Sequence, residues 1–301
     1  MSVRRSELTT PASDINMLEK ASNSPADEVM IDLEDSVAHD EKVDSRSNVI
    51  DAVEQFDWEG KLISLRMNGL DTPYAYGDVI TVVEAVGEHI DTIVLPKARQ
   101  SEDIYMLDKL LTQIEENNAI EDGLGIEVLI EVTEAVQNVD EIAAASDRLE
   151  SLIFGPGDYS VSLAIPHPGS DYSEETYPGD KWHHVRTAIV NAARTNGLDA
   201  IDGPFADFSD PEAYRRQCSW SRQLGFVGKW AIHPSQIGIA NEVYTPSEEE
   251  LTYAQKVKQA MDRAEEEGRG AARVDGSMVD IANRKYAEEI LERGEELGLG
   301  D

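Results

Sequence analysis

The feature that most constrains the fold is a regular alternation of short apolar segments with longer amphipathic ones. Each short segment has the length and composition of a strand, and each longer one has the apolar spacing of a helix. Strands that alternate with helices form parallel sheets with right-handed crossovers. We predict strands at 7–9, 28–33, 62–67, 92–95, 126–131, 151–154, 198–201 and 229–232, with helices at 14–21, 42–55, 75–87, 101–117, 134–145, 181–196 and 210–224.

The number of predicted strands, eight, favours closure into a barrel over an open sheet. A (β/α)8 barrel typically takes about 250 residues, so the 301 residues suit a barrel with a modest extension. A dinucleotide-binding open sheet is the alternative, but no G-x-G-x-x-G motif follows an early strand. We therefore predict an α/β fold, a (β/α)8 TIM barrel that forms the catalytic domain over residues 1–245.

The segment 246–301 lies outside the eight-strand pattern and is predicted to be a helical extension. Ser247 followed by three glutamates is typical of a helix start, because acidic side chains stabilise the first turn. This helix is expected to reach about residue 267, where Gly268 and Gly270 interrupt it, and a second helix is expected at 278–297. The segment is too short to bury a large core of its own, which makes it an extension of the barrel.

The chain carries a formal charge of −34 at pH 7, from 60 acidic and 26 basic residues. At low salt this excess of like charge opposes compaction, whereas molar salt shortens the screening length to about 3 Å. We interpret the composition as that of a salt-adapted, halophilic protein. Intrinsic disorder is the alternative, and the patterned apolar segments disfavour it. The same charge disfavours nucleic acid as a partner.

The sequence has no features of an exported or membrane protein. No run of about 18 apolar residues is present, and the residues after Met1 are polar where a secretory signal needs an apolar stretch. Cys218 is the single cysteine, which excludes an internal disulfide and fits a reducing compartment. We expect a cytoplasmic protein with no membrane partner.

Charged residues follow several predicted strands, at the end of the barrel where active sites gather. Glu131 ends the strand 126–131, and Asp158 follows the strand 151–154. A few carboxylates completed by water and substrate form the octahedron that Mg²⁺ prefers. We predict that Glu131 and Asp158 are direct metal ligands and that Glu34 or Asp35 orders bound water.

Arg66, at the end of the strand 62–67, is a candidate to donate to a carbonyl or carboxylate oxygen as charge develops on it. The alternative is a salt bridge from Arg66 to a carboxylate at the same end of the barrel. For Glu131 the alternative is a structural ion pair with Arg66 or Lys97. Zinc is not expected, because Cys218 is alone and the six histidines show no HExxH spacing.

Several of these residues lie in longer motifs that together cover nearly the whole chain. The motifs are IDLEDSV at 31–37, RMNGLDTP at 66–73, LPK at 95–97, LIE at 129–131, FGPGDY at 154–159, DGPFADFSD at 202–210, GKWAIHPSQ at 228–236 and NEVYTPS at 241–247. On these motifs the chain resembles the citrate-lyase β-subunit-like family of CoA-thioester lyases, the HpcH/HpaI aldolase family. Within it, the DGPF and GKWAIHP segments look most similar to the lyases of L-malyl-CoA and β-methylmalyl-CoA.

The resemblance implies roles for individual residues. Glu131 and Asp158 match the family's ligands for Mg²⁺, with Mn²⁺ as an alternative, and Arg66 matches the arginine that contacts the reacting carbonyl. Asp280, in SMVD at 277–280, matches an acidic residue supplied by the C-terminal segment of a neighbouring subunit. The resemblance therefore implies a homo-oligomer, a trimer or hexamer, in which the extension completes a partner's site. The expected contacts of CoA are Lys20, Pro96 and Lys97.

The implied reaction is the reversible cleavage of (S)-malyl-CoA or β-methylmalyl-CoA to glyoxylate and acetyl-CoA or propionyl-CoA. Mg²⁺ would act as Lewis acid, Arg66 would stabilise developing charge, and Asp280 would transfer the proton. The alternatives are a relative that also hydrolyses the thioester, such as a malyl-CoA thioesterase or a malate synthase, and a citramalyl-CoA lyase. A non-catalytic accessory subunit is a further alternative that the retained site residues disfavour.

Overall fold

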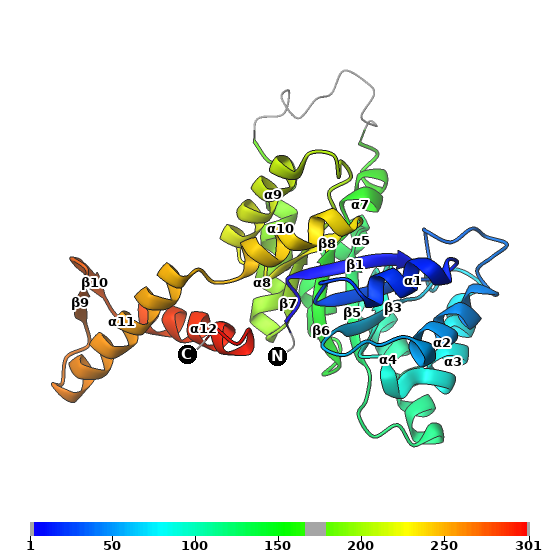
Figure 1. The fold of residues 1–301 in the computed structure, drawn as a ribbon, viewed down its shortest axis with the longest axis horizontal. Helices are drawn as coiled ribbons and strands as arrows, with labels where there is room; N and C mark the ends of the chain where they lie inside the picture. Colours follow the sequence, from blue (N-terminus) through cyan, green and yellow to red (C-terminus); the bar gives the residue numbers. More distant parts are fainter. Residues whose placement is uncertain (1–2, 166–178, 300–301) are drawn as a thin grey trace. The chain divides into compact units, whose positions relative to one another are not determined.

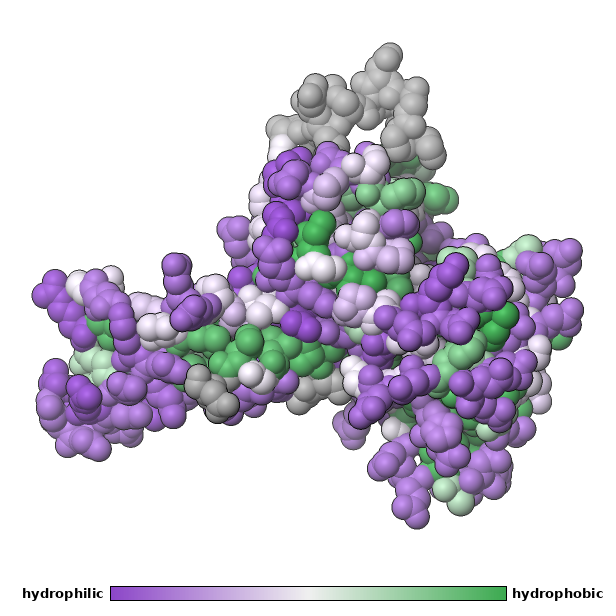
Figure 2. Space-filling view, viewed as in Figure 1, coloured by the Kyte–Doolittle hydropathy of each residue, from purple (hydrophilic) through white to green (hydrophobic). Residues whose placement is uncertain are grey.

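The computed structural model describes residues 3–165 and 179–299, and these form two compact units. One unit comprises Arg4–Asn241, and the other comprises Met1–Val3 with Glu242–Asp301. None of the described helices combines the length and the apolar composition needed to cross a membrane. Figure 2 shows hydrophilic side chains over most of the visible face, as the excess of acidic residues requires.

The unit Arg4–Asn241 is a closed barrel of eight parallel strands in the order β1 to β8, which confirms the predicted fold (Figure 1). All eight predicted strands overlap observed ones, most of them to within two residues. The strands are almost wholly buried, since one face lines the barrel and the other packs under helices. Their bounds are β1 Ser6–Pro11, β2 Glu28–Asp32, β3 Leu62–Arg66, β4 Thr92–Leu95, β5 Gly125–Ile130, β6 Leu149–Phe154, β7 Asp199–Asp202 and β8 Gly228–Ala231.

Helices connect the strands, and local sequence signals fix their ends. The Asp210 side chain caps α9, Pro211 occupies its first turn, and Gly225 ends it in the left-handed conformation that glycine adopts without strain. The predicted helix 134–145 is divided in two at Asn138. The helices are α1 Ile15–Ser22, α2 Ser45–Gln55, α3 Ala75–Val86, α4 Ser101–Asn118, α5 Thr133–Gln137, α6 Val139–Ala143, α7 Pro156–Ser162, α8 His183–Asn196, α9 Pro211–Leu224 and α10 Pro234–Tyr244, with a short 3-10 turn, η1, at Gly87–His89.

The inside of the barrel is layered, because alternate residues of a strand point to the same side. The middle layer is an apolar cluster of Met30, Val94, Leu129, Ile153, Ile201 and Trp230. Two positions earlier on β2 and β5 stand Glu28 and Glu127, and two positions later stand Asp32 and Glu131. An apolar layer therefore separates polar side chains at the amino end of the barrel from those at its carboxyl end.

The unit that contains Glu242–Asp301 is built from α11 Glu248–Glu266, the hairpin β9 Ala272–Val274 and β10 Ser277–Val279, and α12 Ile281–Glu296. Ser247 and Glu250 form a reciprocal capping box at the start of α11, which explains the helix predicted there. The second helix begins three residues later than predicted, because 277–279 pairs in the hairpin and Asp280 caps α12. A small core joins these elements; it contains Ala254, Val257, Met261, Val274, Val279 and Ala287.

Candidate functional site

An arginine–aspartate pair forms the base of the site at the carboxyl end of the barrel. Asp32 and Arg66 are register partners at the ends of β2 and β3. Arg66 donates from Nε to Asp32 Oδ1 at 2.7 Å and from Nη2 to Oδ2 at 2.6 Å, and its guanidinium carbon lies 5.1 Å from the centre of the Trp230 ring. Burial disfavours the charged form of Asp32, but Arg66 and the Ser36 hydroxyl outweigh it and lower the pKa of the carboxyl. The salt bridge considered for Arg66 is therefore present.

Glu34 and Lys97 extend this pair toward solvent. Lys97 Nζ lies 2.7 Å from Glu34 Oε1 and 3.3 Å from Asp35 Oδ1, while Arg66 Nη1 lies 3.3 Å from Glu34 Oε2. Burial raises the pKa of Glu34 although both cations oppose the shift. Lys97 has φ of 53°, a left-handed conformation that costs a non-glycine residue roughly 1–3 kcal/mol. Such strain is typical of functional sites. Here the backbone N–H of Lys97 contacts Glu131 while its side-chain ammonium contacts Glu34.

Glu131 is buried at the end of β5 and faces these groups. Its Oε1 accepts the backbone N–H of Lys97 at 2.9 Å, and no described Arg or Lys lies within ion-pair distance of it, so the structural ion pair considered for Glu131 is absent. Burial, with the charges of Glu34 and Asp158, raises the pKa of Glu131 to about 8. The charge of Arg66 opposes this shift from beyond ion-pair distance, so the Glu131 carboxylate is only partly compensated.

Asp158 enters the site from the first turn of α7 and is half-buried. The preceding Gly155 lies against Glu131: a Cβ at Gly155 would stand 2.4 Å from Glu131 Cβ and 2.6 Å from Oε2. Only glycine fits there, and its absence of a side chain lets the β6–α7 turn bring Asp158 toward Glu131. Packing against Glu131 therefore explains the first glycine of the FGPGDY motif, Gly155.

The charges at this end of the barrel do not balance. In the described part of the chain, five carboxylates gather here (Asp32, Glu34, Asp35, Glu131 and Asp158), and their ion pairs come from one guanidinium, that of Arg66, and one ammonium, that of Lys97; the Lys42 ammonium contacts backbone carbonyls nearby. The least compensated carboxylates are those of Glu131 and Asp158. A pair of carboxylates with open positions is the donor set that a hard divalent cation takes. The residues therefore fit a magnesium ion on Glu131 and Asp158.

The other predicted site residues are Pro96, Lys20 and Asp280. Pro96 is buried directly after β4, next to Lys97. Lys20 is exposed in the last turn of α1. Asp280 is exposed in the other compact unit, where its Oδ1 caps α12 by accepting the N–H of Ala282 at 2.9 Å.

Asp32 was not predicted to be a site residue. A charged residue two positions after Met30 on an apolar strand was the available signal. Cys218, by contrast, is buried beside Tyr214, and burial raises its pKa to about 11, which agrees with an unreactive thiol.

The sequence of this chain is similar to those of known proteins. The family model of the HpcH/HpaI aldolase/citrate lyase family matches residues 5–234. The L-malyl-CoA/β-methylmalyl-CoA lyase of Cereibacter sphaeroides is 43% identical over 97% of this chain and 94% of its own length. The malyl-CoA/β-methylmalyl-CoA/citramalyl-CoA lyase of Chloroflexus aurantiacus is 32% identical, with 86% of this chain and 78% of its own covered.

A solved structure has a fold similar to that of this chain. The protein CitE of Mycobacterium tuberculosis, in complex with magnesium, acetoacetate and coenzyme A, is similar with a TM-score of 0.74 and 27% identity, over 96% of this chain and 97% of that one. The family predicted from the sequence motifs is confirmed. The chain belongs to the HpcH/HpaI aldolase/citrate lyase family.

Proposed function

We propose that this protein is a Mg²⁺-dependent carbon–carbon lyase that reversibly cleaves (S)-malyl-CoA or β-methylmalyl-CoA to glyoxylate and acetyl-CoA or propionyl-CoA. The observation that carries the proposal is the pair of under-compensated carboxylates, Glu131 and Asp158, beside Arg66 at the carboxyl end of the barrel. The 43% identity to a lyase of this kind over 97% of the chain supports the substrate class.

Glu131 and Asp158 would hold the metal, and Glu34 and Asp35, fixed by Lys97, would orient its water ligands. When bound, Mg²⁺ would supply Lewis-acid polarisation of the glyoxylate unit and fix its carboxylate. The backbone N–H of Lys97 holds the Glu131 carboxylate in place at 2.9 Å. Mn²⁺, which accepts the same oxygen ligands, is the alternative metal.

Arg66 is positioned to stabilise charge on the substrate. In cleavage, the electron pair of the broken C–C bond passes to the carbon next to the thioester, and the hydroxyl proton passes to water as the C–O bond becomes the aldehyde carbonyl of glyoxylate. Because Asp32 and Trp230 hold the guanidinium in one orientation, Arg66 can donate to an oxygen without reorganising as charge develops. The Lys97 side chain stays next to the same site, where it and Pro96 would contact CoA, with Lys20 as a further phosphate contact.

Asp280 would protonate the acetyl-CoA enolate, or remove the proton in the reverse direction, from a neighbouring subunit. Its exposed carboxylate lies in a small unit with exposed apolar side chains nearby, those of Met278, Ile281 and Tyr286. Exposed apolar groups beside a charged one are typical of an interaction surface. The protein would then be a homo-oligomer, a trimer or hexamer, with residues 1–245 as the catalytic barrel and 246–301 completing a partner's site.

We also infer from the charge and the single cysteine that the protein works in a salt-rich cytoplasm. A formal charge of −34 requires screening for stability, and the one cysteine is buried and unpaired. The temperature of unfolding should therefore rise steeply from tenth-molar to molar KCl. An unfolding temperature that is independent of salt would contradict the salt adaptation without touching the proposed activity.

The test of the function is product analysis in molar KCl. The purified protein is incubated with malyl-CoA, β-methylmalyl-CoA and citramalyl-CoA, with and without Mg²⁺. Glyoxylate with acetyl-CoA or propionyl-CoA, formed only with the metal, is the expected result. Pyruvate from citramalyl-CoA would favour the activity that the Chloroflexus relative's name includes. Free CoA would indicate a hydrolysing enzyme, and no product from any substrate would favour a non-catalytic subunit.

A further inference from the structure

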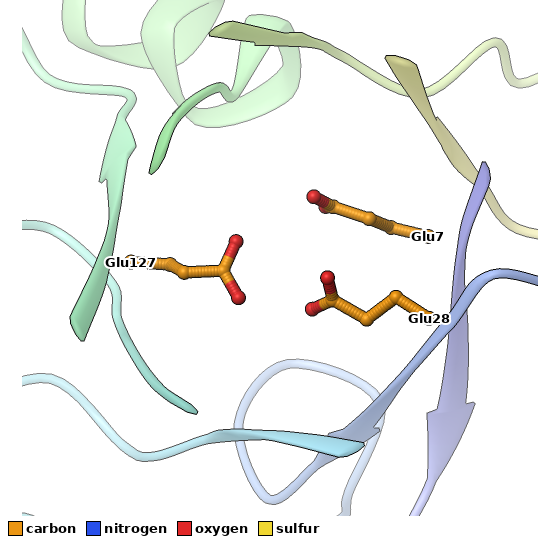
Figure 3. Close-up of side chains that lie close together, drawn as sticks. All are labelled: Glu7, Glu28 and Glu127. Atoms are coloured by element: carbon orange, nitrogen blue, oxygen red, sulfur yellow. The ribbon is translucent and has the colours of Figure 1, made fainter. Parts of the chain in front are cut away.

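A second group of carboxylates lies inside the amino end of the barrel, on the other side of the apolar layer. Glu7 of β1 and Glu28 of β2 lie side by side and point toward Glu127 of β5 on the opposite side of the barrel, and one oxygen of each lies within 4.8 Å of the others (Figure 3). All three side chains have 0% relative exposure. We call these three residues the amino-end cluster.

The members of the amino-end cluster differ in how well they are hydrogen-bonded. Glu127 accepts the Thr92 hydroxyl at 2.6 Å and the Ser151 hydroxyl, so both of its oxygens are satisfied. Glu28 Oε2 accepts Arg4 Nε at 3.0 Å. Neither oxygen of Glu7 receives a hydrogen bond from any residue that the structure describes, whereas the other oxygen of Glu28 has the Ser64 hydroxyl nearby. Buried polar atoms without partners are costly, so the two oxygens of Glu7 need an additional ligand.

The charges of the cluster point to the sign of that ligand. Among the described residues, Arg4 supplies the ion pairs to the cluster, at 3.0 Å to Glu28 and 3.9 Å to Glu127, and the same guanidinium also pairs with Glu150 and Asp199. Three carboxylates and one guanidinium leave two negative charges. Burial, followed by the charges of the neighbouring carboxylates, raises the pKa of Glu7 and Glu28 well above the usual range. The cluster therefore needs positive charge when it is ionised, and either a bound cation or protons held by the carboxyls can supply it.

We propose that the amino-end cluster is a structural binding site for one divalent cation of calcium size, held by Glu7, Glu28 and Glu127. Calcium takes carboxylate oxygens at 2.3–2.6 Å in flexible geometry, so two oxygens on opposite sides of it stand up to about 5 Å apart. The separations within the cluster satisfy this limit. Magnesium would draw opposite oxygens to about 4.2 Å and usually keeps several waters, for which a sealed site offers little room.

The proposed ion is independent of the proposed lyase activity. The layer of Met30, Val94, Leu129, Ile153, Ile201 and Trp230 lies between the cluster and the carboxyl end, so an ion here cannot reach a substrate there. Its effect would be on stability, because a ligand that binds the folded chain alone raises the free energy of unfolding. It would also join β1, β2 and β5 across the barrel.

The test counts calcium in the full chain. Because the cluster is sealed, wild type, Glu7→Gln, Glu150→Gln and Asp158→Asn are unfolded and refolded in molar KCl with calcium or with chelator, then desalted and assayed for bound calcium and for unfolding temperature. Glu7 has no described protein partner, so Glu7→Gln removes a ligand and breaks no ion pair. Glu150→Gln removes a carboxylate that contacts Arg4 outside the cluster, and Asp158→Asn removes the proposed site at the other end.

We expect about one bound calcium per chain in wild type, Glu150→Gln and Asp158→Asn, and none in Glu7→Gln. Calcium should raise the unfolding temperature of the first three proteins and leave that of Glu7→Gln unchanged. Retention of the ion by Glu7→Gln, or its loss in Asp158→Asn alone, would overturn the proposal. The proposal would also be overturned if wild type refolded with calcium retained none and if calcium did not change its unfolding temperature. That result would mean that the carboxyls share protons. If Glu7→Gln fails to refold, the calcium content and calcium response of wild type still decide the question.

Discussion

The two ends of this barrel carry similar residues in different arrangements. At the carboxyl end, Asp32 accepts two hydrogen bonds from the Arg66 guanidinium, and Glu34 forms an ion pair with Lys97. Glu131 accepts a backbone N–H, while Asp158 remains partly open to solvent. At the amino end, the cluster of Glu7, Glu28 and Glu127 is sealed and depends on one shared guanidinium. A site that exchanges substrate needs fixed donors and an open position, whereas a sealed site can serve only the stability of the barrel. The difference therefore separates the catalytic end from the structural end.

The largest effect is expected from Asp158→Asn, which removes one of the two proposed metal ligands. Turnover of malyl-CoA should fall by more than about 10³-fold, since the metal, the orientation of its ligands and the polarisation of the substrate depend on it. The unfolding temperature should change little, because Asp158 is half-buried and belongs to an end with excess negative charge. Steady-state kinetics at saturating Mg²⁺ and thermal unfolding measure the two quantities. A variant with wild-type kcat would remove Asp158 from the site.

Asp280→Asn should lower kcat by about 10²–10⁴-fold, the usual contribution of a general acid or base. Asparagine caps helices about as well as aspartate, so the start of α12 and the fold should survive. Binding of Mg²⁺ and glyoxylate, measured by calorimetry, should be unchanged. Asp275→Asn is the matched control, as an exposed aspartate of the same unit in a left-handed conformation that asparagine tolerates. Equal activity of the two variants would exclude the assigned role of Asp280.

Asp202 provides the contrast to the amino-end cluster, because it is a buried carboxylate with complete compensation. It accepts from Lys229 at 2.6 Å and from Arg186 at 2.8 Å, and although burial opposes them these cations lower its pKa. Asp202→Asn leaves the buried Lys229 without its ion pair and Arg186 with Asp180 alone, and should cost about 3–5 kcal/mol of unfolding free energy at neutral pH. Because the folded-state pKa is depressed, the wild-type advantage is present above an ordinary aspartate pKa, near 3.8, and is lost as pH falls through the folded-state value.

Denaturant unfolding of wild type and Asp202→Asn across this pH range in molar KCl measures the difference. The control is Asp207→Asn in the loop that follows β7, whose carboxylate is exposed and should contribute little. A difference between wild type and Asp202→Asn that persists unchanged at the acid end of the range would show that the ion pairs are not its source.

The smallest of these effects is expected from Arg66→Lys, which keeps a positive charge beside Asp32 but loses the planar, two-pronged contact. We expect a fall in kcat of about 10²–10³-fold, as for the loss of one oriented donor to a developing oxyanion. The KM for glyoxylate in the condensation direction should change less. A variant with reduced stability and full kcat would assign to Arg66 the structural role alone.

Most of the fold could be predicted because local sequence patterns specify the strands and helices of the barrel. Each strand is a short apolar run bounded by turn residues, and the helix starts at Ser247 and Asp210 carry capping side chains. Glu131 and Asp158 could be placed at the carboxyl end because each stands at or just after the end of a strand. Local sequence therefore located the catalytic end of the barrel.

What escaped prediction depends on contacts between distant segments. The pairing of Asp32 with Arg66 follows from the register of β2 against β3, which the two strands do not show separately. Glu7, Glu28 and Glu127 begin or interrupt three apolar strands, and only closure of the barrel brings them together. The hairpin at 272–279 replaced part of a predicted helix because its turn is formed by Asp275 and Gly276, both at positive φ.

The most direct test of the account compares the two ends in one assay: the rate of malyl-CoA cleavage as a function of Mg²⁺ concentration for wild type, Glu131→Gln and Glu150→Gln. Glu131→Gln neutralises a proposed ligand at the carboxyl end, and Glu150→Gln makes the same change beside Arg4 at the amino end. The account predicts saturable activation by Mg²⁺ in wild type and Glu150→Gln, and no activation in folded Glu131→Gln. Mg²⁺-activated cleavage by Glu131→Gln at the wild-type rate would contradict it.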